Sequence, residues 1–220
     1  MESSVSGVGV LDKSVLVLDV LEARPRSLAE LVEATGLSRA TAHRLAVALE
    51  RHGLVRRDED GRFTLGVRLV ALGRAAAAAI PLADAAGPAL AELRDVTGES
   101  VQLYVREGDR RVCIAALESP HGLRTIVPMG ASLPLDKGSA GRLLGVEPGE
   151  PVPPWVQSVG EREAGVASVS APVLGADGAV VGAVSVSGPI ERTTRQPGKR
   201  YAEAVVAAAR RVERAAGLQA

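Results

Sequence analysis

The 220-residue sequence is poor in cysteine and in aromatic side chains, and it has no excess of charge of either sign. The single Cys113 excludes an internal disulfide and any metal site built from several cysteines, and the three histidines are scattered. With only four aromatic residues, base stacking on aromatic platforms is not expected as a mode of nucleic-acid binding. Basic and acidic residues balance at 26 each, so any attraction to DNA must come from local clustering.

Long apolar runs are also missing. No segment approaches the roughly 20 apolar residues that span a bilayer, and the polar start MESSVSG has no apolar signal core. With 46% hydrophobic and 24% charged residues, the composition is that of a globular chain. The sequence therefore predicts two ordinary domains in the reducing cytoplasm, without a membrane partner.

The first 66 residues carry the start and stop signals of a small helical module. Ser27 and Glu30 form a capping box in front of a short apolar helix. The following TGLS segment supplies a turn glycine, Gly36, and a new N-cap, Ser38, ahead of a third helix over 39–52. Two helices joined by a tight glycine turn are typical of the helix-turn-helix, whose second helix lies in the major groove.

The third helix has one apolar face and one polar face. Its apolar stripe is expected to face the core and comprises Ala42, Leu45, Ala46 and Leu49. The outer face is expected to read DNA and comprises Ser38, Arg39, Thr41, His43 and Arg44. Arginine can donate two bonds to guanine, whereas serine and threonine bond to phosphates or base edges. For His43 alone, an exposed and solvated side chain is the plainer interpretation.

A basic hairpin follows the third helix. Two short alternating runs flank Asp60-Gly61, which predicts a two-residue turn. Arg57 and Arg62 of this wing are expected on phosphates, and Arg56 belongs to the same DNA-binding set. Between positions 39 and 68, seven arginines stand against four acids. The alternative is a small three-helix domain with a solvated hairpin that serves protein contacts.

The remaining sequence predicts a linker helix and an α+β domain. Residues 67–80 have high helix propensity and end before Pro81; their apolar face either joins two protomers or packs on its own domain. A helix is expected over 82–97, with a possible break at Gly87-Pro88. Period-two runs then predict antiparallel strands, and a closing helix begins near Pro197.

Paired serines mark two of the late strands. Ser168 and Ser170 share one strand face, and Ser185 and Ser187 share another. If both faces border one cavity, their hydroxyls can bind the carboxylate or amine of a small metabolite. The alternative is that small hydroxyls merely fill a sheet face that is packed against a helix.

Nothing in the sequence predicts catalysis. No nucleophile, base and orienting acid stand out, and no glycine-rich phosphate loop precedes a helix. Cys113 lies inside an apolar alternation and is expected to be a buried small hydrophobe. We therefore expect a protein that is not an enzyme and that has no bound cofactor or metal. A small-molecule enzyme whose turnover depends on Cys113 is the less favoured alternative.

Three segments resemble the IclR family of bacterial regulators, from about Gly7 to the last helix. They are LDKSVLVLDVLE, then LAELVEATGLSRATAHRLAVALERHGLVRRDEDGRFTLGVRL, and finally VSVSGPIERTTR. The segments GVGVLDK, LRDVTGESVQLY and SVGEREAGVASVSAPV look closest to the actinobacterial branch that governs amino-acid metabolism, including leucine biosynthesis.

The resemblance implies an organisation and a set of partners. It implies a winged helix-turn-helix over 7–66, a dimerising linker helix over 67–81, and a GAF-like effector-binding and oligomerisation domain over 82–220. The protein would be a homodimer or tetramer that binds double-stranded, palindromic operator DNA as a repressor or an activator. Its effector would be an amino acid or a related small carboxylate.

The resemblance also implies an effector pocket. Carried over by position, its residues are Leu123, Thr125, Ser139, Ala140, Ser158, Ser168, Ser185 and Ser187. Ser158 and Ser168 stand where some members have an acid and a cysteine, which argues against a ligand of the glyoxylate or pyruvate kind. Only LLGVEPGEPVPPW separates the helix near Ala140 from the next strand, where the family usually has further helices. The pocket is then shallower and more open, or the regulator is ligand-blind.

Overall fold

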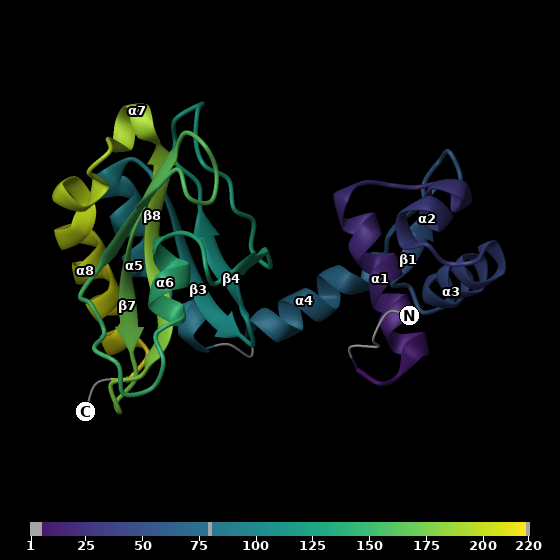
Figure 1. Ribbon diagram of the computed structural model, residues 1–220, viewed down its shortest axis with the longest axis horizontal. Helices are drawn as coiled ribbons and strands as arrows, with labels where there is room; N and C mark the ends of the chain where they lie inside the picture. Colours follow the sequence, from purple (N-terminus) through teal and green to yellow (C-terminus); the bar gives the residue numbers. More distant parts are fainter. Residues whose placement is uncertain (1–5, 79–80, 219–220) are drawn as a thin grey trace. The chain divides into compact units, whose positions relative to one another are not determined.

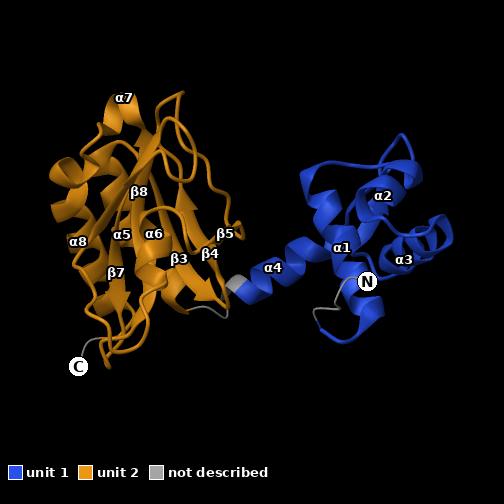
Figure 2. Ribbon diagram, viewed as in Figure 1, with its two compact units in different colours: residues 1–76 blue, residues 77–220 orange. Residues whose placement is uncertain are grey.

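The computed structural model describes residues 6–78 and 81–218, which fall into two compact units. Unit 1 comprises Met1–Ala76 and unit 2 comprises Ala77–Ala220 (Figure 2). Unit 1 is mainly helical with a small hairpin, and unit 2 is an antiparallel sheet with flanking helices (Figure 1). The predicted α+β class is confirmed.

Unit 1 is a three-helix module followed by a hairpin and a further helix. Its elements are α1 (Gly9–Ala23), α2 (Leu28–Thr35), α3 (Arg39–Arg51), β1 (Val55–Arg57), β2 (Phe63–Leu65) and most of α4 (Arg68–Ala78), whose last two residues belong to unit 2. Side chains from α1, α2, α3 and both strands form one apolar core. All four residues of the predicted apolar stripe of α3 are buried, as expected. The core thus fixes which face of α3 points outward.

The predicted signals at the helix ends are confirmed. The Ser27 side chain accepts the Glu30 N–H, and the Glu30 carboxylate accepts the Ser27 N–H at 2.8 Å, which together make a capping box. Gly36 ends α2 with φ +66°, a left-handed conformation that glycine adopts without strain. Ser38 then caps α3.

The turn of the hairpin differs from the prediction. Asp58 and Arg62 still pair through a backbone bond of 2.9 Å, so the loop holds three residues, 59–61, instead of two. The Asp58 carboxylate accepts the N–H groups of Asp60 and Arg62, and Gly61 takes φ +72°. The side chain of Asp58 organises the loop, and a three-residue loop with glycine in the left-handed region is a common hairpin form.

The linker helix is α4, which begins one residue later than predicted. Residues 79 and 80 of the predicted linker, like the last two residues of the predicted C-terminal domain, lie outside the described residues. Pro81 is the first residue of the next helix and not the last of the linker. Proline suits a first helical position because its missing N–H would have no partner there.

Unit 2 is built around one six-stranded antiparallel sheet. Its strands are β3 (Ser100–Glu107), β4 (Arg110–Leu117), β5 (Ser132–Pro134), β6 (Val156–Val159), β7 (Val166–Leu174) and β8 (Val180–Pro189). The spatial order is β5-β4-β3-β8-β7-β6. The late part of the sequence therefore forms one half of the sheet, and β8 joins it to β3 at the centre.

Helices cover both faces of this sheet (Figure 1). The helices of unit 2 are α5 (Pro81–Thr97), α6 (Ser139–Leu144), α7 (Ile190–Thr193) and α8 (Pro197–Ala215). Helices α5 and α8 pack on one face, where the main apolar core lies, and α6 packs on the other. The break expected at Gly87-Pro88 is wrong: α5 is continuous, because both residues lie on its exposed side while Ala86, Ala89 and Leu90 hold it on the core.

Candidate DNA-reading helix and effector cavity

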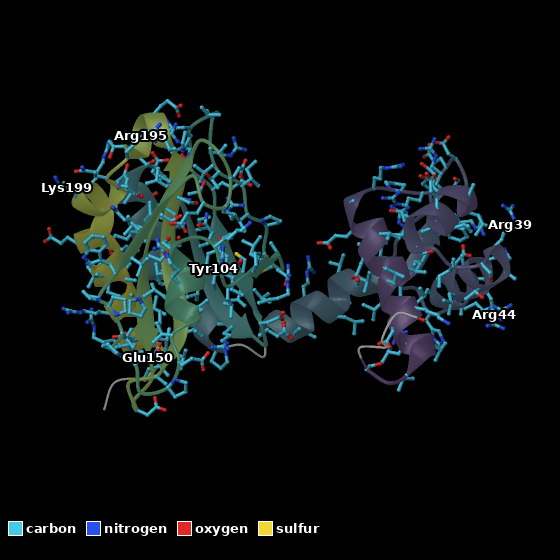
Figure 3. All side chains as sticks on the ribbon, in the orientation of Figure 1. Arg39, Arg44, Tyr104, Glu150, Arg195 and Lys199 are labelled. Carbon is cyan, nitrogen blue, oxygen red and sulfur yellow. The ribbon has the colours of Figure 1, made fainter. Side chains whose placement is uncertain are left out.

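The outward face of α3 presents three side chains that are available to a partner. Arg39, His43 and Arg44 are exposed. Figure 3 shows Arg39 and Arg44 projecting from α3 away from the body of unit 1. Within the described part of the chain, none of the three makes a side-chain hydrogen bond or an ion pair. These donors are therefore uncommitted, as a base-reading face requires.

Ser38 and Thr41 have a different status from the arginines. The Ser38 hydroxyl donates to Thr41 Oγ1 at 2.9 Å, and Ser38 Oγ accepts the Thr41 N–H at 3.3 Å. The Ser38 hydroxyl thus caps α3, and the Thr41 hydroxyl accepts a hydrogen bond from it. Their first role is to fix the start of the helix, which sets where Arg39 lies.

The wing is tied to the helical core at two places. Arg26 and Phe63 exchange backbone bonds of 2.9 and 2.8 Å, so the chain before α2 adds a bridge to β2. Gly66 donates its N–H to the Leu54 carbonyl at 2.8 Å, and a Cβ at Gly66 would overlap the Gly53 carbonyl. The hairpin is thereby fixed relative to α3.

The three wing arginines divide into two groups. The Arg57 guanidinium lies 4.1 Å from the centre of the Phe63 ring, 3.5 Å from the Glu50 carboxylate, and donates to the Gly61 carbonyl. Arg57 therefore braces the hairpin. The side chains of Arg56 and Arg62 are exposed, and neither forms an ion pair within residues 6–78 and 81–218.

In unit 2, the sheet face beneath α6 carries rows of hydroxyl groups. The strand register aligns four serines across β6, β7, β8 and β3: Ser158, Ser168, Ser187 and Ser100. The adjacent row holds Ser170, Ser185 and Gln102. The valines between them, such as Val169 and Val186, point to the opposite face and its apolar core, as the alternation predicted.

These hydroxyls are bonded to one another. Ser139, the first residue of α6, lies 2.7 Å from the hydroxyls of both Ser168 and Ser170. Ser170 then donates to Ser185 at 2.9 Å. Ser187 donates to Gln102 Oε1 at 3.1 Å. The chain of hydroxyls joins α6 to the sheet and satisfies polar groups that are otherwise buried.

A small cavity of about 20 Å³ lies between α6 and this face. Six of the eight predicted effector residues line it: Ser139, Ala140, Ser158, Ser168, Ser185 and Ser187. That volume holds on the order of one water molecule. The structure thus brings the predicted serines together, with little free space between them.

The other two predicted effector residues lie elsewhere. Leu123 and Thr125 line a separate hollow of about 440 Å³, and Leu123 is 70% exposed. Val166 lines both the hollow and the small cavity. Thr125 is buried, and its hydroxyl has no hydrogen-bond partner among the described residues.

Sequence reasoning missed five side chains of the small cavity: Gln102, Tyr104, Arg111, Arg162 and Val166. Arg111 is only 3% exposed and donates to the carbonyls of Pro134 and Lys137. Its guanidinium lies 5.4 Å from the centre of the Tyr104 ring. Burial raises the pKa of the Tyr104 hydroxyl and lowers the pKa of Arg111. In sequence Arg111 sits among charged hairpin residues, so only the strand pairing reveals its burial.

Cys113 is buried, and burial raises the pKa of its thiol to about 12. A protonated, inaccessible thiol is a poor nucleophile. In the described part of the chain, no group of three histidine, cysteine or acidic side chains is placed to hold a metal ion. Nor is any single described helix long and apolar enough to cross a bilayer.

Two family models match most of the chain. The IclR helix-turn-helix domain matches residues 10–59, and the bacterial transcriptional regulator IclR C-terminal domain matches residues 74–147 and 154–214. The families and relatives that match are transcriptional regulators and not enzymes. The interruption at 148–153 falls in the connection from α6 to β6, which has no helix or strand.

Named relatives are similar to different lengths of the chain. The regulator KipR of Bacillus subtilis is 29% identical over 66% of this chain, and the repressor YiaJ of Escherichia coli is 30% identical over 63%. The matches cover 59% and 50% of those proteins, so the chain spans about half the length of these relatives. The repressor AllR of Escherichia coli is 25% identical over 97% of this chain and 92% of its own.

Solved structures share the fold over nearly the whole chain. The IclR protein of Thermotoga maritima superposes with a TM-score of 0.71, at 23% identity, over 95% of this chain and 99% of that one. An IclR homologue of Microbacterium hydrocarbonoxydans, solved with 4-hydroxybenzoate, gives 0.79 at 21% identity, over 94% and 99%. At these identities the likeness concerns the fold.

Proposed function

Because this chain belongs to the IclR family of bacterial transcriptional regulators, we propose that α3 reads its operator while the serine-lined cavity of unit 2 senses a small metabolite. The proposal for DNA binding rests on the outward face of α3, where the side chains of Arg39 and Arg44 are exposed and bonded to no described residue (Figure 3). Arg39 and Arg44 read bases, with His43 nearby. Ser38 and Thr41 place the start of the helix and reach backbone phosphates.

We propose that the wing supplies phosphate contacts beside the groove. The exposed Arg56 and Arg62 fit this role, since phosphate contacts need accessible positive charge and no particular base. Arg57, which was expected on a phosphate, is engaged with Phe63 and Glu50. Its proposed contribution is to hold the hairpin so that Arg62 reaches the DNA backbone.

We propose a homodimer or tetramer organised as a DNA-binding domain over 7–66, a linker helix over 67–81 and an effector domain over 82–220. Within unit 1, large apolar side chains remain exposed at the start of α1, just before α4 and along α4: Val10, Leu11, Val67, Val70 and Leu72. Exposed apolar surface of this kind favours association. A dimer with two reading helices matches a palindromic operator. The proposed location of the protein is the cytoplasm.

The proposed effector is an amino acid or a related small carboxylate, and the proposed targets are genes of amino-acid metabolism. Support for the site comes from the six predicted residues that line one cavity. Support for the targets comes from the resemblance of GVGVLDK, LRDVTGESVQLY and SVGEREAGVASVSAPV to the branch that governs leucine biosynthesis.

A ligand-blind regulator is the second candidate, and the size of the cavity favours it. About 20 Å³ is too little for a metabolite unless side chains move, and the serines already satisfy one another. In this case the hydroxyl chain only joins α6 to the sheet.

Two experiments test these proposals. In the first, DNA fragments that the full chain binds are recovered and sequenced, and they should share a palindromic motif near genes of amino-acid metabolism. If no motif is enriched, the proposal that α3 reads an operator is contradicted. If the motif lies near other genes, only the proposed targets are contradicted.

In the second, thermal-shift screening of metabolites should give a specific rise in the melting temperature of the full chain by mass action. Ser185→Leu, which fills the cavity, should abolish that rise, whereas Ser185→Ala keeps the space. No shift with any metabolite would favour the ligand-blind candidate.

A further inference from the structure

The small cavity contains a buried positive charge that has no acidic hydrogen-bond or ion-pair partner within residues 6–78 and 81–218. Arg111 is 3% exposed, and its guanidinium donates only to the neutral carbonyls of Pro134 and Lys137. Its Nε–H is buried and has no hydrogen-bond partner in the described part of the chain. Arginine stays protonated in proteins, so it cannot escape this cost by losing its charge.

The rest of the cavity lining has a consistent chemistry. It offers hydroxyl groups, the Gln102 amide and a second guanidinium, that of Arg162. Among the residues that the structure describes, no aspartate or glutamate contributes to the lining. The two acids that flank Arg162 in the sequence do not line the cavity themselves, and each is already bonded at its edge. Glu161 pairs with Arg142 and accepts the Gly138 N–H, and Glu163 pairs with Arg162 at 3.4 Å. The charge of the exposed Asp136 raises the pKa of Arg111, but this effect is smaller than the lowering by burial.

The backbone is shaped to hold the guanidinium in place. Gly138 has φ +80°, and a Cβ there would come within 3.3 Å of Arg111 Nη2. A Cβ at Gly141 would overlap Arg111 Nη1 and the Leu135 carbonyl. The glycines of the GSAG segment therefore leave room for Arg111 under α6, and the two carbonyl bonds fix its orientation.

Resting on the proposed effector role of this cavity, we propose that its ligand is a small carboxylate without an ammonium group, and that Arg111 is the residue that selects it. A carboxylate would compensate the unpaired charge of Arg111, and the hydroxyls around it would donate to the remaining lone pairs. An α-ammonium group would find no acid and would lie beside two guanidinium groups. Amino acids are therefore disfavoured relative to the matching carboxylates that carry hydrogen in place of the ammonium group.

Side chains of the lining must move when a ligand binds, and Arg162 is the lining residue best placed to move. This residue lies in the 160–165 loop between β6 and β7, and its side chain is 25% exposed. Its displacement leaves every strand pair intact. Opening also requires the Ser139 hydroxyl to break its hydrogen bond with Ser168 and to bond to the ligand instead.

Calorimetric titration of the full-length wild-type chain tests the selectivity. The probes are three matched sets: acetate, glycine and acetamide; propionate, alanine and propionamide; and 4-methylpentanoate, leucine and 4-methylpentanamide. Inorganic phosphate serves as a further anion. We expect one carboxylate to bind at least about tenfold more tightly than its amino acid and its amide. An amino acid or amide that binds as tightly as its carboxylate, or phosphate that binds more tightly, would overturn the proposal.

Variants test the role of Arg111 separately. Arg111→Gln should weaken carboxylate binding at least about 30-fold, the lower end for truncating a buried charged pair. Arg111→Lys should keep part of the affinity, and Arg110→Gln, the exposed neighbour on β4, should keep all of it. Unchanged binding in Arg111→Gln would refute the assignment; should that variant not fold, the wild-type titrations still decide. If another metabolite class raises the melting temperature while carboxylates do not, only this inference fails. If no metabolite does, the effector proposal fails with it.

Discussion

Replacing Arg57 and Arg62 of the wing one at a time should separate bracing from DNA contact. Arg57 is stacked on Phe63 and paired with Glu50, with 42% of its side chain exposed. The stacking contributes about 0.5–1 kcal/mol, and a half-exposed pair adds at most about 1 kcal/mol. Arg57→Ala should therefore destabilise the hairpin by about 0.5–2 kcal/mol, while the salt dependence of operator binding stays the same.

Arg62→Ala should have the opposite profile. Its side chain is exposed and makes no ion pair among the described residues, so the loss of stability should stay within about 0.5 kcal/mol. One lost phosphate contact per bound protomer should reduce the slope of log affinity against log salt by about 0.9 for each protomer. Fluorescence anisotropy over a salt series gives the slope, and amide exchange across 55–65 gives the local stability. The reasoning would be refuted if Arg57→Ala flattened the slope as much as Arg62→Ala and left exchange unchanged.

Three further outcomes follow from the local geometry. Ser27→Ala removes one half of the capping box and should cost about 1 kcal/mol, measured by urea unfolding; Ala29→Ser on the exposed side of α2 is the neutral control, and equal stability of both variants would refute the role of the cap. Gly66→Ala places a Cβ on the Gly53 carbonyl, which should displace the hairpin from its position beside α3 and lower operator affinity. Unaltered affinity would mean that DNA binding does not need the hairpin in this position. The thiol of Cys113, with a pKa of about 12, should resist a thiol reagent at pH 8 until the chain unfolds, and rapid labelling of the native protein would contradict its burial.

Burial of Cys113 also gives a sign for the dependence of stability on pH. Because the folded-state pKa is raised above the ordinary value of 9.0, the folded state keeps a proton that the unfolded state releases. The thiol's contribution to stability is complete below pH 9 and is lost as the pH rises from about 9 to about 12. Cys113→Ala should reduce that alkaline loss, as followed by urea unfolding across this range. An identical loss in the variant would show that another group is responsible.

Local chemistry made the DNA-binding unit predictable. The Ser27 box, the positive φ of Gly36 and the Ser38 cap depend on residues within a few positions of one another, so the sequence alone determines them. The hairpin was predicted in place but with the wrong loop, because the Asp60-Gly61 signal does not reveal that Asp58 closes the turn with its side chain.

In unit 2, the sequence predicts the features that depend on the alternation of side chains along a strand. It predicts less well those that depend on contacts between segments far apart in the sequence. The serines of β7 and β8 share a face because alternation places them there. The buried Arg111 depends on β5, α6 and two glycines that approach it from more than 20 residues away. In α5, burial of Ala89 and Leu90 outweighs the break that Gly87-Pro88 suggests, which a local propensity cannot show.

The central claim, that the outward face of α3 reads bases, is tested most directly by a specificity ratio. The measurement is the affinity of the full chain for its recovered operator divided by that for a scrambled duplex, at one fixed salt concentration. In Arg39→Ala/Arg44→Ala this ratio should collapse toward one, because each bidentate base contact contributes about 1–3 kcal/mol of discrimination. Lys199→Ala on α8, which removes an exposed charge from unit 2, should leave the ratio at its wild-type value. A double variant that kept the wild-type ratio would contradict the account.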